Sequence, residues 1–77
     1  MYYVYVIKDR FKRTIYIGYT SDLKRRLREH STTKNPELIY YESYKSELDA
    51  RERERKLKQR GQAIRHLKQR IKVSLKE

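Results

Sequence analysis

The 77-residue sequence contains no cysteine and no tryptophan, and it has one proline and two glycines. The lack of cysteine excludes a disulfide framework and thiolate metal sites, and it suits a reducing compartment. No apolar run approaches the roughly 20 residues that a membrane-spanning helix needs, and no basic segment leads into a long apolar stretch at the N-terminus. We therefore expect no membrane partner and a cytoplasmic location.

The chain is also short, and nothing in its composition marks a linker or a second module. A chain of this size buries only about 60% of the surface that its unfolded state exposes, so its core should be thin. The sequence predicts a single domain over residues 1–77.

Acidic residues are scarce relative to basic ones. There are 21 lysines and arginines against 10 aspartates and glutamates, which gives a formal net charge of +11. The excess is greatest in residues 51–77, which hold 11 basic and 3 acidic residues. A charge of this size on a small body attracts polyanions, and together with the tyrosines it indicates nucleic-acid binding. The alternative is a basic surface that only keeps the protein soluble.

Beta-branched and aromatic residues fill residues 2–8 and 14–19, and both stretches are predicted to be strands. The short polar connection between them favours an antiparallel hairpin. Residues 38–44 have a similar composition and predict a third strand.

The alternation within the first two strands separates aliphatic from aromatic positions. Val4 and Val6 face one way and Tyr5 the other, while Tyr16 and Gly18 lie opposite the isoleucines of the second strand. If the aliphatic positions share a core face, Tyr5 and Tyr16 share the reverse face. A register slip of one residue would remove this relation.

A helix is predicted directly after the second strand. Thr20 or Ser21 is expected to cap it, with Asp22 in its positively polarised first turn. Arg26 and His30 lie four residues apart, on the flank of a stripe of leucines. This helix therefore presents a guanidinium and an imidazole on one side.

Two more helices are predicted in the second half of the chain. The sequence Ser46-Glu47-Leu48-Asp49 resembles a capping box, and its helix should run to about Arg60, where Gly61 provides a break. The apolar residues of the last helix follow helical spacing at Ile64, Leu67, Ile71 and Leu75. The order β-β-α-β-α-α predicts an α/β fold of the α+β type, a small three-stranded antiparallel sheet flanked by helices.

One carboxylate of the second helix differs from the others. At about 100° per residue, Glu54 falls in the same stripe as Ala50 and Leu57, whereas Glu52 points elsewhere. A carboxylate directed toward the sheet needs a salt bridge or a metal ion. An arginine-paired structural glutamate and a metal ligand both remain open from the residues alone.

These residues together resemble the GIY-YIG nuclease superfamily, specifically its small stand-alone bacterial members related to the N-terminal nuclease domain of the excision-repair endonuclease. The resemblance covers nearly the whole chain. The matching positions are Val4-Tyr5-Val6 and Tyr16-Ile17-Gly18 for the two name-giving motifs, Arg26, His30, and Glu54 between Ala50 and Lys58.

The chain departs from the family pattern in two places. The first motif lacks its glycine and isoleucine. Many family nucleases also carry a late asparagine that helps to order the site, whereas Asn35 is the only asparagine here, and Gln62 or Gln69 would have to replace it.

The resemblance implies hydrolysis of phosphodiesters with Mg²⁺ or Mn²⁺. Glu54 would hold the ion, since magnesium typically takes only one or two protein carboxylates. Arg26 would offset the charge on the phosphoryl oxygens. Tyr5 would act as general base toward water, with its phenolate stabilised by metal and arginine, and Tyr16 would orient the water or the phosphate. His30 would bind phosphate or share proton transfer.

The implied function is that of a DNA endonuclease with low sequence specificity, of the kind used in DNA repair. Gly18 is expected to leave room for a phosphate backbone, and the alternative is that it only relieves a strand end or bulge. Further nucleic-acid contacts are expected from Lys24, Arg25, Lys58 and Arg65. The alternatives are a DNA- or RNA-binding module with little or no cleavage, and a nuclease that acts only when tethered by a protein partner.

Overall fold

The computed structural model describes residues 1–32, 35–59 and 61–76. Its strands and helices follow the predicted order, with one additional short helix at the C-terminal end. In chain order they are β1 (Tyr2–Asp9), β2 (Ile15–Thr20), α1 (Leu23–His30), β3 (Pro36–Tyr44), α2 (Glu47–Lys58), α3 (Gln62–Arg70) and α4 (Lys72–Lys76).

The sheet is antiparallel throughout and has the order β2-β1-β3, so β1 is central and β2 lies at one edge. Tyr5 pairs with Gly18, and Ile7 pairs with Tyr16. Because side chains alternate along a strand, this register places Tyr5 and Tyr16 on the same face, as predicted. The pairing of β1 with β3 shifts between Val6 and Ile7.

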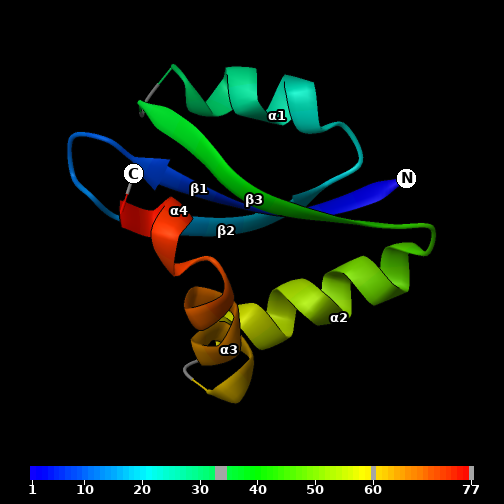
Figure 1. Ribbon diagram of the computed structural model, residues 1–77. Helices are drawn as coiled ribbons and strands as arrows, with labels where there is room; N and C mark the ends of the chain where they lie inside the picture. The colour runs from blue at the N-terminus through cyan, green and yellow to red at the C-terminus, as the bar shows by residue number, and fades with distance from the viewer. Residues whose placement is uncertain (33–34, 60, 77) are drawn as a thin grey trace.

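The two faces of the sheet are covered by different helices. Helix α1 lies over one face and α2 and α3 lie over the other, while α4 lies near the end of the sheet where β1 leads into β2 (Figure 1). The principal core forms between the sheet and α2–α3 from Val4, Val6, Ala50, Leu57, Leu67 and Ile71. Burial of a valine or leucine side chain stabilises the fold by about 1.5–3 kcal/mol, so even this small cluster anchors α2 firmly.

The start of α1 differs from the prediction. Thr20 is the last residue of β2, and its hydroxyl oxygen accepts a hydrogen bond from the backbone N–H of Asp22 at 3.1 Å. Asp22 itself is the N-cap, and its side chain accepts from the N–H of Arg25 at 3.1 Å. The cap therefore lies one or two residues later than expected, because the strand continues through Thr20.

The predicted capping box of α2 is wrong. Ser46 occupies the N-cap position, but its side chain makes no capping hydrogen bond. The helix ends at Lys58. The predicted endpoint, Arg60, lies outside the described residues, and Gly61 becomes the N-cap of α3.

The predicted last helix is divided in two. Ile71 separates α3 from α4 and has φ −109° and ψ 26°, outside the helical region. Its side chain is buried in the core, and the amine of Lys8 donates to the carbonyl of Leu75 at 2.9 Å. The bend at Ile71 therefore accompanies the docking of α4 against β1.

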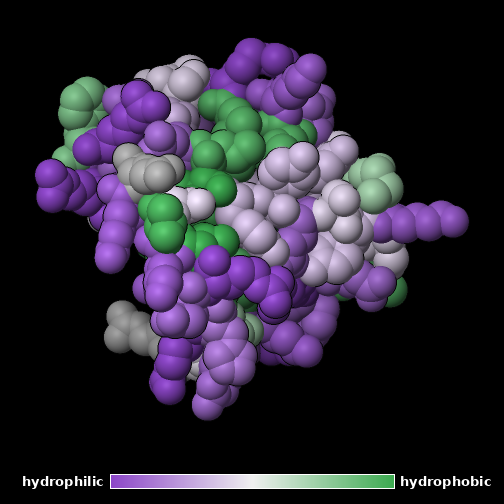
Figure 2. All heavy atoms as spheres, viewed as in Figure 1, coloured by the Kyte–Doolittle hydropathy of each residue, from purple (hydrophilic) through white to green (hydrophobic). Residues whose placement is uncertain are grey.

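No helix in the described ranges is long and apolar enough to cross a membrane. Figure 2 shows a mainly hydrophilic surface over α2 and α3, in keeping with the many basic residues of this half of the chain.

Candidate active site

The two motif tyrosines lie close together beside the edge strand β2. The ring centroids of Tyr5 and Tyr16 are 6.4 Å apart. Gly18 lies beneath the phenol of Tyr5, since a Cβ atom at position 18 would be 2.3 Å from its hydroxyl oxygen and 2.5 Å from Cζ. The space over Gly18 is therefore filled by Tyr5. This finding replaces the expected reason for the glycine, room for a phosphate backbone, with an internal one.

Helix α1 brings the predicted arginine and histidine to the same phenol. Nε of Arg26 donates to the hydroxyl oxygen of Tyr5 at 3.3 Å, and Nε2 of His30 lies 3.0 Å from that oxygen. Because a guanidinium can only donate, the Tyr5 oxygen accepts from Arg26, whereas the direction of the hydrogen bond between Tyr5 and His30 depends on the tautomer of the imidazole. The ring of His30 also packs edge-on against Tyr16, with centroids 4.9 Å apart.

The burial of Tyr5 changes its expected role. Its exposed fraction is 0%. Burial raises the pKa of the Tyr5 hydroxyl, and this effect outweighs the hydrogen bond and charge of Arg26, which lower the pKa. Arg26 by itself therefore does not bring the pKa of Tyr5 below its ordinary value, and a phenolate stabilised by metal and arginine together stays a prediction. Tyr16 remains partly exposed on the edge strand.

Arg26 is held by more than the tyrosine. Its Nη1 donates to the carboxylate of Glu29 at 3.0 Å. The hydrogen bonds to Tyr5 and then Glu29 raise the pKa of Arg26, with a smaller contribution from Tyr16. Glu29 was missed in the sequence, although its spacing of three residues from Arg26 on one helix is a signal for such a pair.

Glu54 reaches the same edge of the sheet from α2. Its side chain is only 21% exposed, and its carboxylate pairs with the amine of Lys58 at 3.2 Å. The same amine lies 6.0 Å from the ring centroid of Tyr16. The charge of Glu54 is one of the factors that raise the pKa of Tyr5. The structure thus brings together Tyr5, Tyr16, Arg26, His30 and Glu54, which come from four different elements.

The arginine-paired structural glutamate exists, but it is Glu42 on β3. Arg53 binds its carboxylate through Nε at 2.9 Å and through Nη2 at 3.0 Å. Tyr40 donates to it at 2.6 Å and Tyr44 donates as well. Burial raises the pKa of Glu42, but these hydrogen bonds outweigh burial and hold it below the ordinary value. The alternation of Tyr40, Glu42 and Tyr44 in one strand was the available signal.

The number of carboxylates at Glu54 suits a divalent ion such as Mg²⁺. The described residues hold no group of three or more histidine, cysteine, aspartate or glutamate side chains arranged for a metal, so no closed cage forms. An open position with one carboxylate, paired with a half-exposed lysine, matches the preference of Mg²⁺ for one or two protein carboxylates plus waters and phosphate oxygens. Glu54 is thus the residue that would hold the ion.

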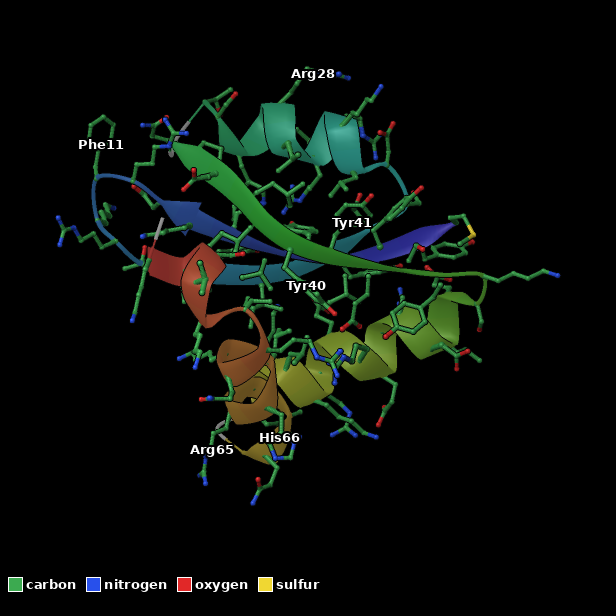
Figure 3. All side chains as sticks on the ribbon, viewed as in Figure 1. Phe11, Arg28, Tyr40, Tyr41, Arg65 and His66 are labelled. Carbon is green, nitrogen blue, oxygen red and sulfur yellow. The ribbon has the colours of Figure 1, made fainter. Side chains whose placement is uncertain are left out.

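The residues expected to contact nucleic acid are spread over three helices. Lys24 and Arg25 are exposed on α1, and Lys58 is exposed beside Glu54 and Tyr16. Arg65 lies on α3 and points away from the sheet (Figure 3). Of these, the contacts of the described residues bring Lys58 to the tyrosine cluster.

The position of the late family asparagine finds no equivalent among the candidates. The backbone carbonyl of Asn35 accepts from the N–H of Arg10 at 3.1 Å, which links Asn35 to the residue after β1. Gln62 and Gln69 are exposed on α3. The cluster is ordered instead by Glu29 on one side and Lys58 on the other.

Comparison with known proteins agrees with the site. The family model described as the GIY-YIG catalytic domain matches residues 1–72. No curated protein and no solved structure matches the chain. The family match spans β1 to the start of α4 and includes all five residues of the cluster. The chain therefore belongs to the GIY-YIG family of nucleases.

Proposed function

We propose that this protein is a metal-dependent endonuclease that hydrolyses DNA phosphodiester bonds with low sequence specificity. The observation that carries the proposal is the meeting of two phenols, a guanidinium, an imidazole and a carboxylate at the β2 edge. The family match supports action on nucleic acid. The choice of DNA, the metal and the low specificity are our own inferences.

Arg26 is the residue we assign to the scissile phosphate. Tyr5 and Glu29 each accept a hydrogen bond from it, and these bonds fix the plane of the guanidinium. Its side chain is 39% exposed, so it remains accessible to a substrate oxygen. A positioned charge of this kind is worth more in a transition state than a mobile one, because it needs no reorganisation during the reaction.

Tyr16 is the residue we assign to the attacking water, and Tyr5 becomes a positioning residue. Tyr5 is fully buried and cannot touch substrate in this conformation, whereas Tyr16 is partly exposed at the edge strand. The Tyr5 hydroxyl orients Arg26 and His30 from behind. This assignment reverses the roles that the sequence resemblance implied for the two tyrosines.

Glu54 is the proposed metal ligand. When bound there, Mg²⁺ or Mn²⁺ supplies Lewis-acid polarisation of the phosphoryl group and stabilisation of the leaving oxygen. Without the ion, Lys58 pairs with the Glu54 carboxylate. Its half-exposed side chain is able to move toward a phosphate when the ion binds.

Low sequence specificity follows from the kind of surface around the site. Exposed basic residues suit phosphate contacts, which position a duplex without reading bases; they are Lys58 beside the site, Lys24 and Arg25 on α1, and Arg65 farther away on α3. We propose that Gly18 acts through Tyr5 and makes no direct contact with DNA. A cytoplasmic location and a role in DNA repair belong to the same proposal.

The test is cleavage of supercoiled plasmid DNA and of labelled RNA with Mg²⁺ or Mn²⁺. Glu54→Ala and Arg26→Ala should each lose nicking by about 10²–10³-fold. Glu52→Ala is the matched control on α2, because Glu52 is exposed and pairs only with Arg55 among the described residues. Arg28→Ala is the matched control on α1. Equal activity in Glu54→Ala and Glu52→Ala would overturn the site.

Two observations favour a second function. Tyr5 is completely buried, and no candidate for the late asparagine joins the cluster in the described residues. A nucleic-acid-binding module without efficient cleavage would show these features. Binding of DNA or RNA without metal-dependent nicking supports the module, and cleavage that appears only after fusion to a DNA-binding protein supports a tethered nuclease.

A further inference from the structure

A basic cleft lies at the end of the sheet where β1 turns into β2. It has a volume of about 840 Å³. Its described basic residues come from β1, from the β1–β2 loop and from the last two helices, and they are accompanied by one acid, Glu37; they are Lys8, Arg10, Arg13, Lys68 and Lys76. Glu37 pairs with Arg10 at 3.5 Å, which leaves a clear excess of positive charge.

This cleft adjoins the proposed active site. A smaller groove of about 430 Å³ runs beside β2 and is lined by Tyr16 and Lys58. Ile15 and Lys68 line both the groove and the cleft. The two cavities therefore meet at Ile15, where β2 begins, and at Lys68 of α3. Arg13, which lines the cleft, and Tyr16, which lines the groove, are three positions apart in the sequence.

The loop that borders the cleft is held in one conformation by Asp9. This aspartate is 7% exposed, and Oδ1 accepts from the N–H groups of Phe11 at 2.9 Å and Lys12 at 3.1 Å. Its backbone carbonyl accepts from the N–H of Arg13 at 2.7 Å. A loop ordered in this way loses little entropy when a ligand binds to its side chains.

Arg13 occupies a backbone conformation that does not suit arginine. Its φ of 56° is the one positive φ at a non-glycine residue in the described ranges. Glycine, asparagine and aspartate adopt this left-handed region at lower cost. The turn alone therefore does not account for an arginine here, whereas a role for its side chain in the cleft does.

Phe11 is the most exposed large apolar residue of the loop. It is 83% exposed, and it projects from the tip of the hairpin (Figure 3). Arg10, Lys12 and Arg13 surround it in sequence. A single exposed phenylalanine needs no explanation by itself, but an aromatic ring on an ordered basic loop is the arrangement with which proteins stack on unpaired bases.

We propose that the loop of residues 10–13 and the cleft beside it bind the DNA strand that continues past the scissile phosphate. The basic residues hold its backbone, and Phe11 stacks on an unpaired base. The inference rests on the proposed nuclease function, because that function places the scissile phosphate from which the DNA strand continues into the cleft. It names the substrate class as DNA with unpaired bases next to the cleavage site.

The test measures binding by fluorescence anisotropy without metal, in a Glu54→Ala background that does not cleave. Three labelled DNAs are compared: a blunt duplex, the same duplex with an overhang, and a single strand. The overhang and the single strand should bind tighter than the duplex. Phe11→Ala should weaken binding of the unpaired DNAs by about tenfold and leave the duplex nearly unchanged, whereas Phe11→Tyr should retain the preference.

Arg13 is tested with Arg13→Asn, which keeps the left-handed turn. Affinity should fall for all three DNAs by about threefold to tenfold, and the slope of log K against log salt should decrease by about 0.7–0.9. The melting temperature should stay equal or rise, because asparagine suits the backbone better. A lower affinity without a change in salt slope would contradict a phosphate contact.

Two matched controls define failure. Leu48→Ala removes another exposed apolar side chain, 77% exposed on α2, and Lys45→Asn removes a cation between β3 and α2, at the other end of the sheet (Figure 1). If these variants bind DNA as weakly as Phe11→Ala and Arg13→Asn, or if all four bind like the parent, the loop has no special role. Because no cleavage is measured, this result is independent of the nuclease proposal.

Discussion

The glutamates at the two edges of the sheet differ in how many side chains bind their carboxylates. Arg53 and Glu54 are neighbours on α2, yet Arg53 turns toward Glu42 on β3, while Glu54 lies with Lys58 and Tyr16 on the β2 side. Glu42 receives hydrogen bonds from an arginine and two tyrosines. Among the described residues, Glu54 forms one ion pair, with Lys58.

This difference separates a structural carboxylate from one available for chemistry. A partly buried carboxylate whose lone pairs are filled has no capacity for a new ligand, and removing it leaves its donors unpaired. A carboxylate paired with one exposed lysine contributes little to the free energy of unfolding, and it is able to accept a cation. Helix α2 therefore makes its saturated ion pair with β3, through Arg53 and Glu42, and carries the proposed metal ligand Glu54 on its β2 side.

The largest expected effect comes from removing a tyrosine hydroxyl group, at the proposed active site or at the β3 edge. Tyr16→Phe should lower cleavage by about 10³-fold, because it removes the hydroxyl assigned to the attacking water. Tyr5→Phe should lower cleavage by about 10–100-fold through the loss of Arg26 and His30 positioning. Tyr44→Phe should leave cleavage unchanged and lower the free energy of unfolding by about 1.5 kcal/mol.

These three variants are compared by plasmid nicking and by urea unfolding. An equal loss of activity in Tyr44→Phe and Tyr16→Phe, with both proteins folded, would show that the two edges do not differ in function. A Tyr5→Phe variant more impaired than Tyr16→Phe would restore Tyr5 as the group closest to the chemistry.

The next effect concerns stability. Glu42→Ala should lower the free energy of unfolding by about 3 kcal/mol, because Arg53 and two phenols lose their partner at a partly buried position. Glu54→Ala should change it by less than about 1 kcal/mol, because Glu54 forms a single pair with an exposed lysine. Urea denaturation followed by circular dichroism measures both. A larger loss in Glu54→Ala than in Glu42→Ala would reverse the comparison.

A third effect tests the role of Gly18 in the β2 edge. A methyl group there would overlap the Tyr5 phenol, so Gly18→Ala should cost about 2 kcal/mol and displace Tyr5 from Arg26 and His30. Gly61→Ala is the control, since nothing lies within 4 Å of the added Cβ, and its stability should change by less than about 0.5 kcal/mol. Thermal unfolding and plasmid nicking of both variants decide whether the glycine serves the tyrosine.

The smallest effect is the pH dependence of the β3 edge. The lowered pKa of Glu42 means that its stabilisation is fully present above its ordinary value of about 4.5 and is lost as the pH falls through the folded value. Burial, followed by the hydrogen bond to Glu42, raises the pKa of Tyr44 to about 12, so this contribution is present below about pH 10 and is lost as the pH rises toward 12. Glu42→Gln should flatten both limbs of a stability-against-pH curve, and an unchanged curve would contradict the assignment.

The sheet and the positions of its tyrosines could be predicted from the sequence because they depend on local alternation. The pairing of Tyr5 with Gly18 follows from a short hairpin, in which the register has few alternatives. The stripe that placed Glu54 with Ala50 and Leu57 is likewise a property of one helix.

The features that sequence did not reveal depend on contacts between elements. The complete burial of Tyr5 arises because α1 covers its face, and the Tyr5 phenol in turn fills the space over Gly18. The two tyrosine partners of Glu42 follow from alternation within β3, but its pairing with Arg53 requires α2 to pack against β3, which no local pattern encodes. The bend at Ile71 depends on the docking of α4, so helical spacing alone predicted one continuous helix.

The most direct measurement is Mn²⁺ binding by electron paramagnetic resonance in the presence of a short DNA, with wild type, Glu54→Gln and Glu42→Gln. Both substitutions remove one negative charge and change little volume. Glu54 lies in α2, and Glu42 faces α2 from β3. We expect Glu42→Gln to keep the bound Mn²⁺ signal and Glu54→Gln to weaken binding by about tenfold or more. Retention of the signal in Glu54→Gln, with its loss in a folded Glu42→Gln, would contradict the assignment of the β2 edge as the active site.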